Sequence, residues 1–362
     1  MRKPRVLFIM HLPPPVHGPA VMGTLIRDSR EIAGSFDCRY LNLSASSSLE
    51  EVGKGSIHKL RFLFRLLRQE GSILRRWKPD LVYVTPTSTL PSLWKDFFVI
   101  RMARRKGVRV LLHFHNKGVA ARSSRWLDDC VYRKLFTDAG VILLSEALIP
   151  DVEKYVPAGR ISICPNGLDY PGCRRESREG IPRLLFLSNL LPGKGIVDLL
   201  DACALLRKRD IPCSCHLVGK PSAAISASDI QRLVSDRGLE GTVFYDGPKY
   251  GTEKVEALSQ ADVFVHPTRE DCFPLVILEA MAAGLPVVST REGAIPEEVE
   301  DGVTGLLCPK GDPVRLSEAL ARLLEDPSLR ERMGAAGYQR YRERFTGACF
   351  EKRIISILQS YV

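Results

Sequence analysis

The chain has 362 residues, enough for two domains that each bury a core of their own. Hydrophobic residues make up 45% of it and charged residues 26%, the composition of an ordinary soluble globular protein. No apolar run is long enough to cross a bilayer, and the apolar segment Val6–Met10 predicts a first strand rather than a signal peptide.

The ten cysteines have no regular spacing. Cys213 and Cys215 are separated by one residue, and no second pair completes a zinc site. We therefore expect reduced thiols, no bound metal and a cytoplasmic location.

The net charge of +10 is distributed unevenly along the chain. Residues 1–171 contain 27 Lys and Arg against 15 Asp and Glu, whereas residues 172–362 contain 25 against 27. The basic character therefore belongs to the first half, which favours an anionic partner there.

In the first half, predicted strands alternate with predicted helices. The strands are the apolar segments Arg5–Met10, Asp80–Pro86, Val108–His115 and Ala139–Ser145. The helices lie around residues 20–33, 57–76, 91–106 and 124–136.

Two of these predicted strands are followed by residues suited to ligand binding. Gly18 follows the first strand, where a glycine before a helix lets backbone N–H groups approach a phosphate, although it also suits a simple turn. His113 and His115 end the third strand and share one face, and a histidine at a strand end can hydrogen-bond a sugar.

The segment Ile57–Gln69 predicts a basic amphipathic helix. Its apolar residues at helical spacing are Ile57, Leu60, Phe64 and Leu67, and the basic residues between them are Lys59, Arg61, Arg65 and Arg68. Such a helix either packs on the core with a solvated basic face or attaches to an anionic membrane, where each basic residue contributes about 1 kcal/mol. The sequence leaves both interpretations open.

The second half repeats the alternation after a break at Asp169–Pro182, which is rich in proline, glycine and charge. The predicted strands are Arg183–Asn189, Cys213–Gly219, Thr242–Gly247, Val263–Pro267 and Pro286–Thr290. Two doubly wound α/β domains follow from this pattern, with ligands expected beyond the carboxyl ends of the strands.

Lys194 lies between two glycines after the first strand of the second half. A lysine in this position is suited to neutralising a leaving diphosphate, although alone it also fits a solvated turn.

The most informative segment is REDCFPLVILEAMAAGLPVVST, Arg269–Thr290. It predicts a helix from about Pro274 to Ala283, followed by a buried strand. Asp271 then precedes the helix and Glu279 lies two turns into it. The first N–H groups of a helix favour an anion such as a diphosphate, and the flanking carboxylates can accept hydrogen bonds from sugar hydroxyls.

Taken together, these segments resemble the GT-B fold glycosyltransferases, specifically the large retaining group called glycosyltransferase family 4. The resemblance covers nearly the whole chain. It is carried by PPPVHGPAVMG, HFHN, CPNGLD, PGKG, the long segment Arg269–Thr290, GAIPEEVEDGVTGLLCP and the terminal RYRERF. It implies two Rossmann-like domains that face each other across a cleft, and a C-terminal helix that crosses back to the first domain.

The resemblance also implies domain boundaries. Residues 1–171 would bind the acceptor, residues 172–181 would form a linker, and residues 182–340 would bind the nucleotide sugar. Residues 341–362 would form the helix that packs back on the first domain.

Four residues would act in catalysis by the same resemblance: His115, Lys194, Asp271 and Glu279. Glu279 would hold the ribose hydroxyls, Asp271 the donor sugar and Lys194 the diphosphate, while His115 would contact the sugar from the opposite domain. The other donor-binding residues would be Gly18, Asn189, Gly193, Glu270, Cys272, Phe273, Leu275 and Val276.

Two positions depart from the family pattern. The first acidic residue is usually Glu, whereas here it is Asp271, with Glu270 immediately before it. The phosphate-binding turn usually has an Arg five residues before its Lys, and here that position is Asn189. One positive charge at the diphosphate is therefore missing.

The reaction implied is hexosyl transfer from a UDP- or GDP-linked sugar to an acceptor hydroxyl, with retention at the anomeric carbon and without a metal or other cofactor. The basic first domain suggests a saccharide or polyprenyl-diphosphate-linked acceptor at an anionic membrane surface, in surface polysaccharide synthesis. The protein would then be cytoplasmic or peripheral on the inner face of the membrane.

Two alternatives stay open: a nucleotide-sugar epimerase of the same fold, and a non-catalytic module that binds sugar nucleotides. Nucleic-acid binding would need clustered aromatic residues among the basic ones. Phe62, Phe64 and Trp77 instead fit a core pattern, so we expect no nucleic acid as partner.

Overall fold

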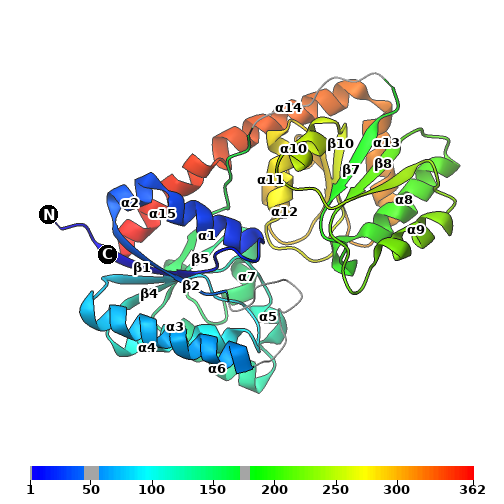
Figure 1. The fold of residues 1–362 in the computed structure, drawn as a ribbon. Helices are drawn as coiled ribbons and strands as arrows, with labels where there is room; N and C mark the ends of the chain where they lie inside the picture. Colours follow the sequence, from blue (N-terminus) through cyan, green and yellow to red (C-terminus); the bar gives the residue numbers. More distant parts are fainter. Residues whose placement is uncertain (1, 45–56, 172–179) are drawn as a thin grey trace. The chain divides into compact units, whose positions relative to one another are not determined.

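The computed structural model describes residues 2–44, 57–171 and 180–362. The chain divides into two compact units (Figure 1), one formed by Met1–Gly167 with Gly347–Val362 and the other by Leu168–Thr346. Most of the predicted linker, residues 172–181, lies outside the described residues.

The first unit is built on a six-stranded parallel sheet with the order β2-β1-β3-β4-β5-β6. Its strands are β1 (Arg5–Met10), β2 (Asp37–Asn42), β3 (Leu81–Val84), β4 (Arg109–His113), β5 (Gly140–Leu143) and β6 (Ile161–Ile163). The apolar runs form the strands because helices cover both faces of the sheet, so that side chains on both faces are buried.

The helices of the first unit lie in two layers (Figure 1), with α1, α2 and α15 on one face of the sheet and α3, α4 and α6 on the other. Their bounds are α1 (Gly18–Asp28), α2 (Arg30–Ser35), α3 (Ile57–Arg76), α4 (Leu93–Arg105), α5 (Val119–Arg122), α6 (Trp126–Phe136), α7 (Ile149–Val152) and α15 (Gly347–Tyr361). Short 3-10 turns occupy Glu146–Leu148 and Ala158–Arg160.

The second unit has a six-stranded parallel sheet with the order β12-β11-β10-β7-β8-β9. Its strands are β7 (Arg183–Leu187), β8 (Ser214–Val218), β9 (Val243–Gly247), β10 (Val263–His266), β11 (Val287–Thr290) and β12 (Gly305–Cys308). The order of the strands reverses between β7 and β10, which is where doubly wound sheets bind their ligands. The predicted doubly wound α/β class is thus confirmed in both units.

Helices α8 and α9 lie on one face of this sheet, and α10 and α11 lie on the other (Figure 1). The bounds are α8 (Ile196–Lys208), α9 (Ala227–Ser235), α10 (Gly251–Ser259), α11 (Leu275–Ala282), α12 (Ile295–Glu298), α13 (Pro313–Glu325) and α14 (Pro327–Arg344), with a 3-10 turn at Pro192–Lys194. Within the described ranges, every helix is too short or too polar to span a bilayer.

The structure differs from the sequence predictions in the first unit. The helix predicted at 20–33 is two helices, because Ser29 is extended and its hydroxyl accepts the N–H of Ile32 at 3.1 Å, which caps α2. Strands β2 and β6 were not predicted, and neither was β12 in the second unit.

Helix α3 has the predicted bounds, but the residues that it buries are not those expected of a core helix. Leu60 and Phe64 are 68% and 70% exposed, whereas Leu66 and Leu74 are buried together with Glu70. The prediction that Phe64 belongs to the core was therefore wrong, and that for Trp77, which is buried, was right.

The chain enters and leaves the second unit at neighbouring residues. Leu168 and Thr346 form an isolated parallel bridge, and the N–H of Leu168 donates to the carbonyl of Phe345 at 3.0 Å. The hydroxyl of Tyr341 also donates to the carbonyl of Leu168, at 2.8 Å. The residues that join the first unit therefore begin at Gly347 rather than at the predicted 341, because Tyr341 is held inside the second unit.

Candidate functional site

The candidate site lies at the strand reversal of the second unit, where the loops after β7 and β10 pack against each other. The carbonyl of Gly193 accepts the N–H of Arg269 at 2.8 Å and that of Glu270 at 3.2 Å. It also accepts the hydroxyl of Thr268 at 3.1 Å. The turn that carries Lys194 is thus joined to the loop that carries Asp271.

Gly195 allows the two loops to come this close. Its φ is +75°, and a Cβ at this position would lie 1.8 Å from the carbonyl oxygen of Pro267. Only glycine satisfies both the left-handed conformation and the close approach. Helix α8 begins at the next residue, so the turn before it is fixed from both sides.

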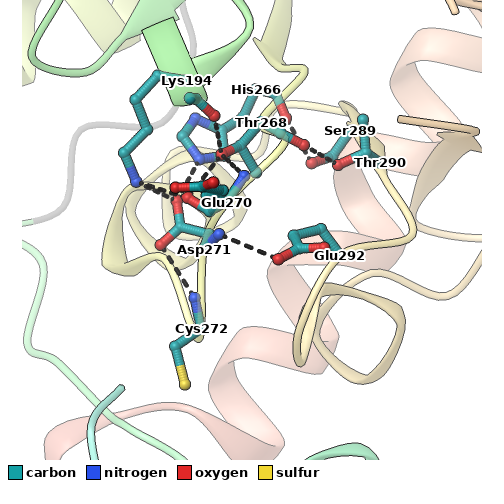
Figure 2. Close-up of polar contacts among 10 residues, drawn as sticks. Lys194, His266, Thr268, Glu270, Asp271, Cys272, Ser289, Thr290 and Glu292 are labelled. Carbon is teal, nitrogen blue, oxygen red and sulfur yellow. Dashed lines mark hydrogen bonds and ion pairs between the residues drawn. The ribbon is translucent and has the colours of Figure 1, made fainter. Parts of the chain in front are cut away.

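Asp271 receives hydrogen bonds from two basic side chains (Figure 2). Lys194 Nζ donates to Asp271 Oδ2 at 2.6 Å, and His266 Nε2 lies 2.9 Å from the same oxygen. The other oxygen, Oδ1, accepts the N–H of Cys272 at 3.2 Å. Asp271 is therefore held in one orientation at the start of the loop that leads to α11.

The pKa of Asp271 reflects this arrangement. Burial acts to raise the pKa, but the hydrogen bond from His266 and the charge of Lys194 outweigh it and bring the pKa down to about 2. The carboxyl group is therefore ionised at neutral pH and acts only as a hydrogen-bond acceptor.

Hydroxyl groups and a further acid support this loop (Figure 2). Ser289 donates to the carbonyl of His266 and Thr290 to that of Thr268, both at 2.6 Å. Glu292 is nearly buried, accepts the N–H of Asp271 at 3.4 Å and is paired with Lys310. The end of β11 and the residues after it thus support the backbone that leads into Asp271.

Glu279 lies on α11 and is paired with a residue that the sequence analysis did not identify. Lys254 Nζ, from α10, donates to Glu279 Oε1 at 2.6 Å. Glu279 Oε2 is buried and has no hydrogen-bond partner among the described residues. One oxygen of this carboxylate is therefore open to a donor from a ligand.

The predicted residues around the start of α11 have separate environments. Pro274 is the residue before the helix rather than its first residue, so Leu275 and Val276 carry the first N–H groups, which have no acceptor within the helix. Phe273 is buried, with its ring centroid 6.0 Å from that of Phe345. Cys272 is buried as well, and its side chain points away from the Lys194 cluster (Figure 2).

Two further predicted donor-binding residues are exposed. The side chain of Glu270 is not the one paired with Lys194, although its carbonyl accepts from Lys194 Nζ at 3.3 Å. Asn189 follows β7, and its carbonyl accepts the N–H of Leu191 at 2.8 Å. Of the two adjacent acids, Asp271 is thus the one that the structure pairs with the lysine.

The remaining predicted residues, Gly18 and His115, lie in the first unit at the carboxyl ends of β1 and β4. Gly18 begins α1, and apart from the adjoining backbone no described residue lies within 4 Å of the position that a Cβ would take there. The preceding His17 caps the helix through Nδ1, which accepts the N–H of Ala20 at 3.3 Å.

His115 is buried, and neither ring nitrogen has a hydrogen-bond partner in the described part of the chain. Burial lowers its pKa to about 4, an effect that the neighbouring Asn166 side chain partly offsets. The ring is therefore neutral at pH 7, with one nitrogen able to donate and the other to accept. His113, by contrast, is tied to the hydroxyl of Tyr83 at 2.6 Å.

His266 and Lys254 are the site residues that sequence reasoning missed. A signal existed for His266, since it is a histidine at the carboxyl end of a strand, as His115 is. The sequence carries no such signal for Lys254, because its contact with Glu279 depends on how α10 and α11 pack.

Residues 174–340 match the family model described as "Glycosyl transferases group 1". A D-inositol 3-phosphate glycosyltransferase from Paenarthrobacter aurescens is 32% identical over 222 residues, which are 54% of this chain and 54% of that protein. The chain spans about half the length of this and similar curated relatives.

Solved structures share the fold over nearly the whole chain. A sucrose-phosphate synthase from Thermosynechococcus elongatus superposes with a TM-score of 0.77 at 20% identity, covering 99% of each chain. HepE from Anabaena, solved in complex with UDP-glucose, gives a TM-score of 0.73 at 18% identity and covers 98% of this chain and 99% of its own.

Proposed function

We propose that the protein transfers a sugar from a nucleoside-diphosphate sugar to an acceptor hydroxyl, on the basis that residues 174–340 match the model of the group 1 glycosyl transferases. The fold of the chain is GT-B. The observation that carries the proposal is the joined pair of Lys194 and Asp271 at the strand reversal, directly before the N-terminus of α11. HepE, which shares the fold, was solved with UDP-glucose, which supports a nucleotide sugar as the donor.

In the proposed reaction, the bond between the anomeric carbon and the diphosphate oxygen breaks and the acceptor oxygen forms the new bond on the same face of the sugar, while the proton of the acceptor hydroxyl passes to an oxygen of the leaving diphosphate. Negative charge accumulates on the leaving diphosphate. Lys194 has three N–H donors, so it can bind a phosphate oxygen while it stays bonded to Asp271. The free N–H groups of Leu275 and Val276 would supply further fixed donors.

The two carboxylates would recognise hydroxyl groups. Asp271 is ionised and oriented by His266, so it can accept from the donor sugar. Glu279 has one open oxygen, which suits a ribose hydroxyl. Because an ammonium group and backbone donors supply the positive charge, we propose a reaction that needs no metal or other cofactor.

We propose that the first unit binds the acceptor and that an anionic membrane surface is the partner of its basic side. Helix α3 supports this, since the exposed Leu60 and Phe64 lie among the exposed Arg61, Arg65 and Arg68. A saccharide or lipid-linked acceptor in surface polysaccharide synthesis, at the inner face of the cytoplasmic membrane, fits this charge.

The direct test uses Lys194→Ala and Glu279→Ala with UDP- and GDP-sugars and a panel of saccharide and lipid-linked acceptors. Both variants are expected to fold but to turn over at least about a hundredfold more slowly, the range for loss of one preorganised charged contact. The wild-type rate should be the same in EDTA. Unchanged transfer in both variants contradicts the proposal, and an isomerised sugar after incubation with donor alone would indicate an epimerase.

A further inference from the structure

The ion pair between Lys254 and Glu279 links two helices of the second unit. Helix α10 begins just after β9 and helix α11 begins after the loop that follows β10, so both start at the carboxyl edge of the sheet. Lys254 is the fourth residue of α10 and Glu279 the fifth of α11. Their ion pair therefore joins the ligand-facing ends of the two helices.

Both side chains of the pair are less exposed than those of an ordinary surface ion pair. The Lys254 side chain is 28% exposed and that of Glu279 is 15% exposed. A long, flexible lysine in water would gain little from such a contact, but a largely buried carboxylate needs a charged partner to stay in place.

The two carboxylate oxygens of Glu279 differ in their hydrogen bonds. Oε1 accepts from Lys254 and keeps a second lone pair, whereas Oε2 is buried without a partner among the described residues. A buried acceptor without a hydrogen bond is costly unless a ligand supplies the donor. A vicinal diol, with two hydroxyl donors side by side, matches a carboxylate held in this way.

We propose that Lys254 is a positioning residue that fixes the Glu279 carboxylate so that it receives the 2′- and 3′-hydroxyls of the donor ribose. The inference rests on the proposed function and deepens it, because it makes the preference for ribose over 2′-deoxyribose depend on a residue of α10. Lys254 acts through Glu279 and has no part in bond breaking.

The test is the ratio of dissociation constants for 2′-deoxyribo- and ribonucleotides, measured by calorimetry with UDP, GDP and their 2′-deoxy forms. The wild-type protein should bind its preferred ribonucleotide at least about tenfold more tightly than the deoxy form, as expected for a hydrogen bond to a charged group. Lys254→Met should lower that ratio to below about threefold although Glu279 is intact, and Lys254→Arg should restore much of it.

Arg237→Met is the matched control. Arg237 is paired with Asp201 at 2.7 Å elsewhere in the second unit, so its loss also breaks an ion pair but should leave the ratio unchanged. If Lys254→Met only lowers the melting temperature and keeps the wild-type ratio, the pair merely joins two helices and the inference is wrong.

Glu279→Gln separates this outcome from failure of the proposed function. A ratio that collapses in Glu279→Gln but not in Lys254→Met overturns the inference alone. If the ratio of dissociation constants stays at the wild-type value in both variants, Glu279 does not bind the ribose, and the proposed donor site is wrong as well. If Lys254→Met does not fold, Lys254→Gln provides the same comparison.

Discussion

At the scale of single residues, burial affects the pKa values of Asp271, His115 and Glu298 in different ways. Asp271 stays charged because His266 and Lys194 reach it, whereas His115 is neutral because burial lowers its pKa to about 4. Glu298, near Asp271, is also fully buried, and burial followed by the charge of Asp271 raises its pKa well above the usual range. Burial and neighbouring charge thus shift the pKa values of Asp271 and Glu298 in opposite directions.

The neutral His115 makes the stability of the protein depend on pH. The unfolded chain takes up a proton at this residue below about pH 6.5, whereas the folded chain does so only near pH 4. Acid therefore favours unfolding across this interval, and the contribution to stability lost between pH 7 and pH 5 is about 2 kcal/mol.

His115→Gln should remove this contribution. Urea unfolding at pH 7 and pH 5 is expected to show a smaller loss of stability in the variant than in the wild-type protein. Both proteins keep His11 and His113, whose pKa values are lowered mainly by burial, so the difference reports His115 together with its charge effect on these two neighbours. An equal loss in the two proteins would show that His115 is protonated in the folded state above pH 5.

Lys194, Asp271 and Glu279 could be proposed from the sequence because each lies in a local pattern of glycines, a helix start or a family motif. Sequence reasoning could not find that Lys194 and Asp271 form a pair, since they are 77 positions apart and meet only through the sheet order. The contact between Lys254 and Glu279 was missed for the same reason.

At the scale of secondary structure elements, apolar runs predicted the central strands and the long helices well. Strand β2 was missed because it is an edge strand of mixed polarity with only Leu41 fully buried, and β6 because it has three residues. Hydrophobic pattern identifies a strand only where both of its faces are covered.

The turn before α8 offers a test of how closely the site depends on its loops. Gly195→Ala would place a methyl group against the Pro267 carbonyl and force the loops after β7 and β10 apart. We expect a loss of more than about 2 kcal/mol in stability and weaker binding of nucleoside diphosphate, measured by denaturation and calorimetry.

Gly302→Ala separates the steric effect from backbone strain. Gly302 has a similar φ of +81°, but no atom lies within 4 Å of its Cβ position. This variant should cost only about 1 kcal/mol and should bind the nucleotide normally. Equal effects of both substitutions on binding would argue against a role for the contact between the loops.

At the scale of the whole molecule, the net positive charge lies in the first half of the chain, which makes up most of the first unit. The sequence predicted the charge asymmetry directly, but it could not decide whether the apolar residues of α3 face the core. In the structure, α3 buries Leu66, Glu70 and Leu74, whereas Leu60 and Phe64 are exposed to solvent.

If α3 attaches to membranes, the double variant Leu60→Ser/Phe64→Ser should sediment with phosphatidylglycerol vesicles at least about tenfold more weakly than the wild-type protein. The expectation follows from the roughly 1.5–3 kcal/mol gained when one such side chain is buried. Val314→Ser, at a 52% exposed residue of the second unit, is the control and should bind normally. If the wild-type protein sediments equally with neutral and with phosphatidylglycerol vesicles, an anionic surface is not its partner.

The bridge between Leu168 and Thr346 means that the second unit is an insertion in the first, with its two junctions side by side. Residues 168–346 therefore constitute one continuous segment of the chain. A truncation after residue 346 removes residues of the first unit, although the second unit comes immediately before them in the sequence. It keeps every residue of the second unit in the chain, and it removes α15 from the first unit.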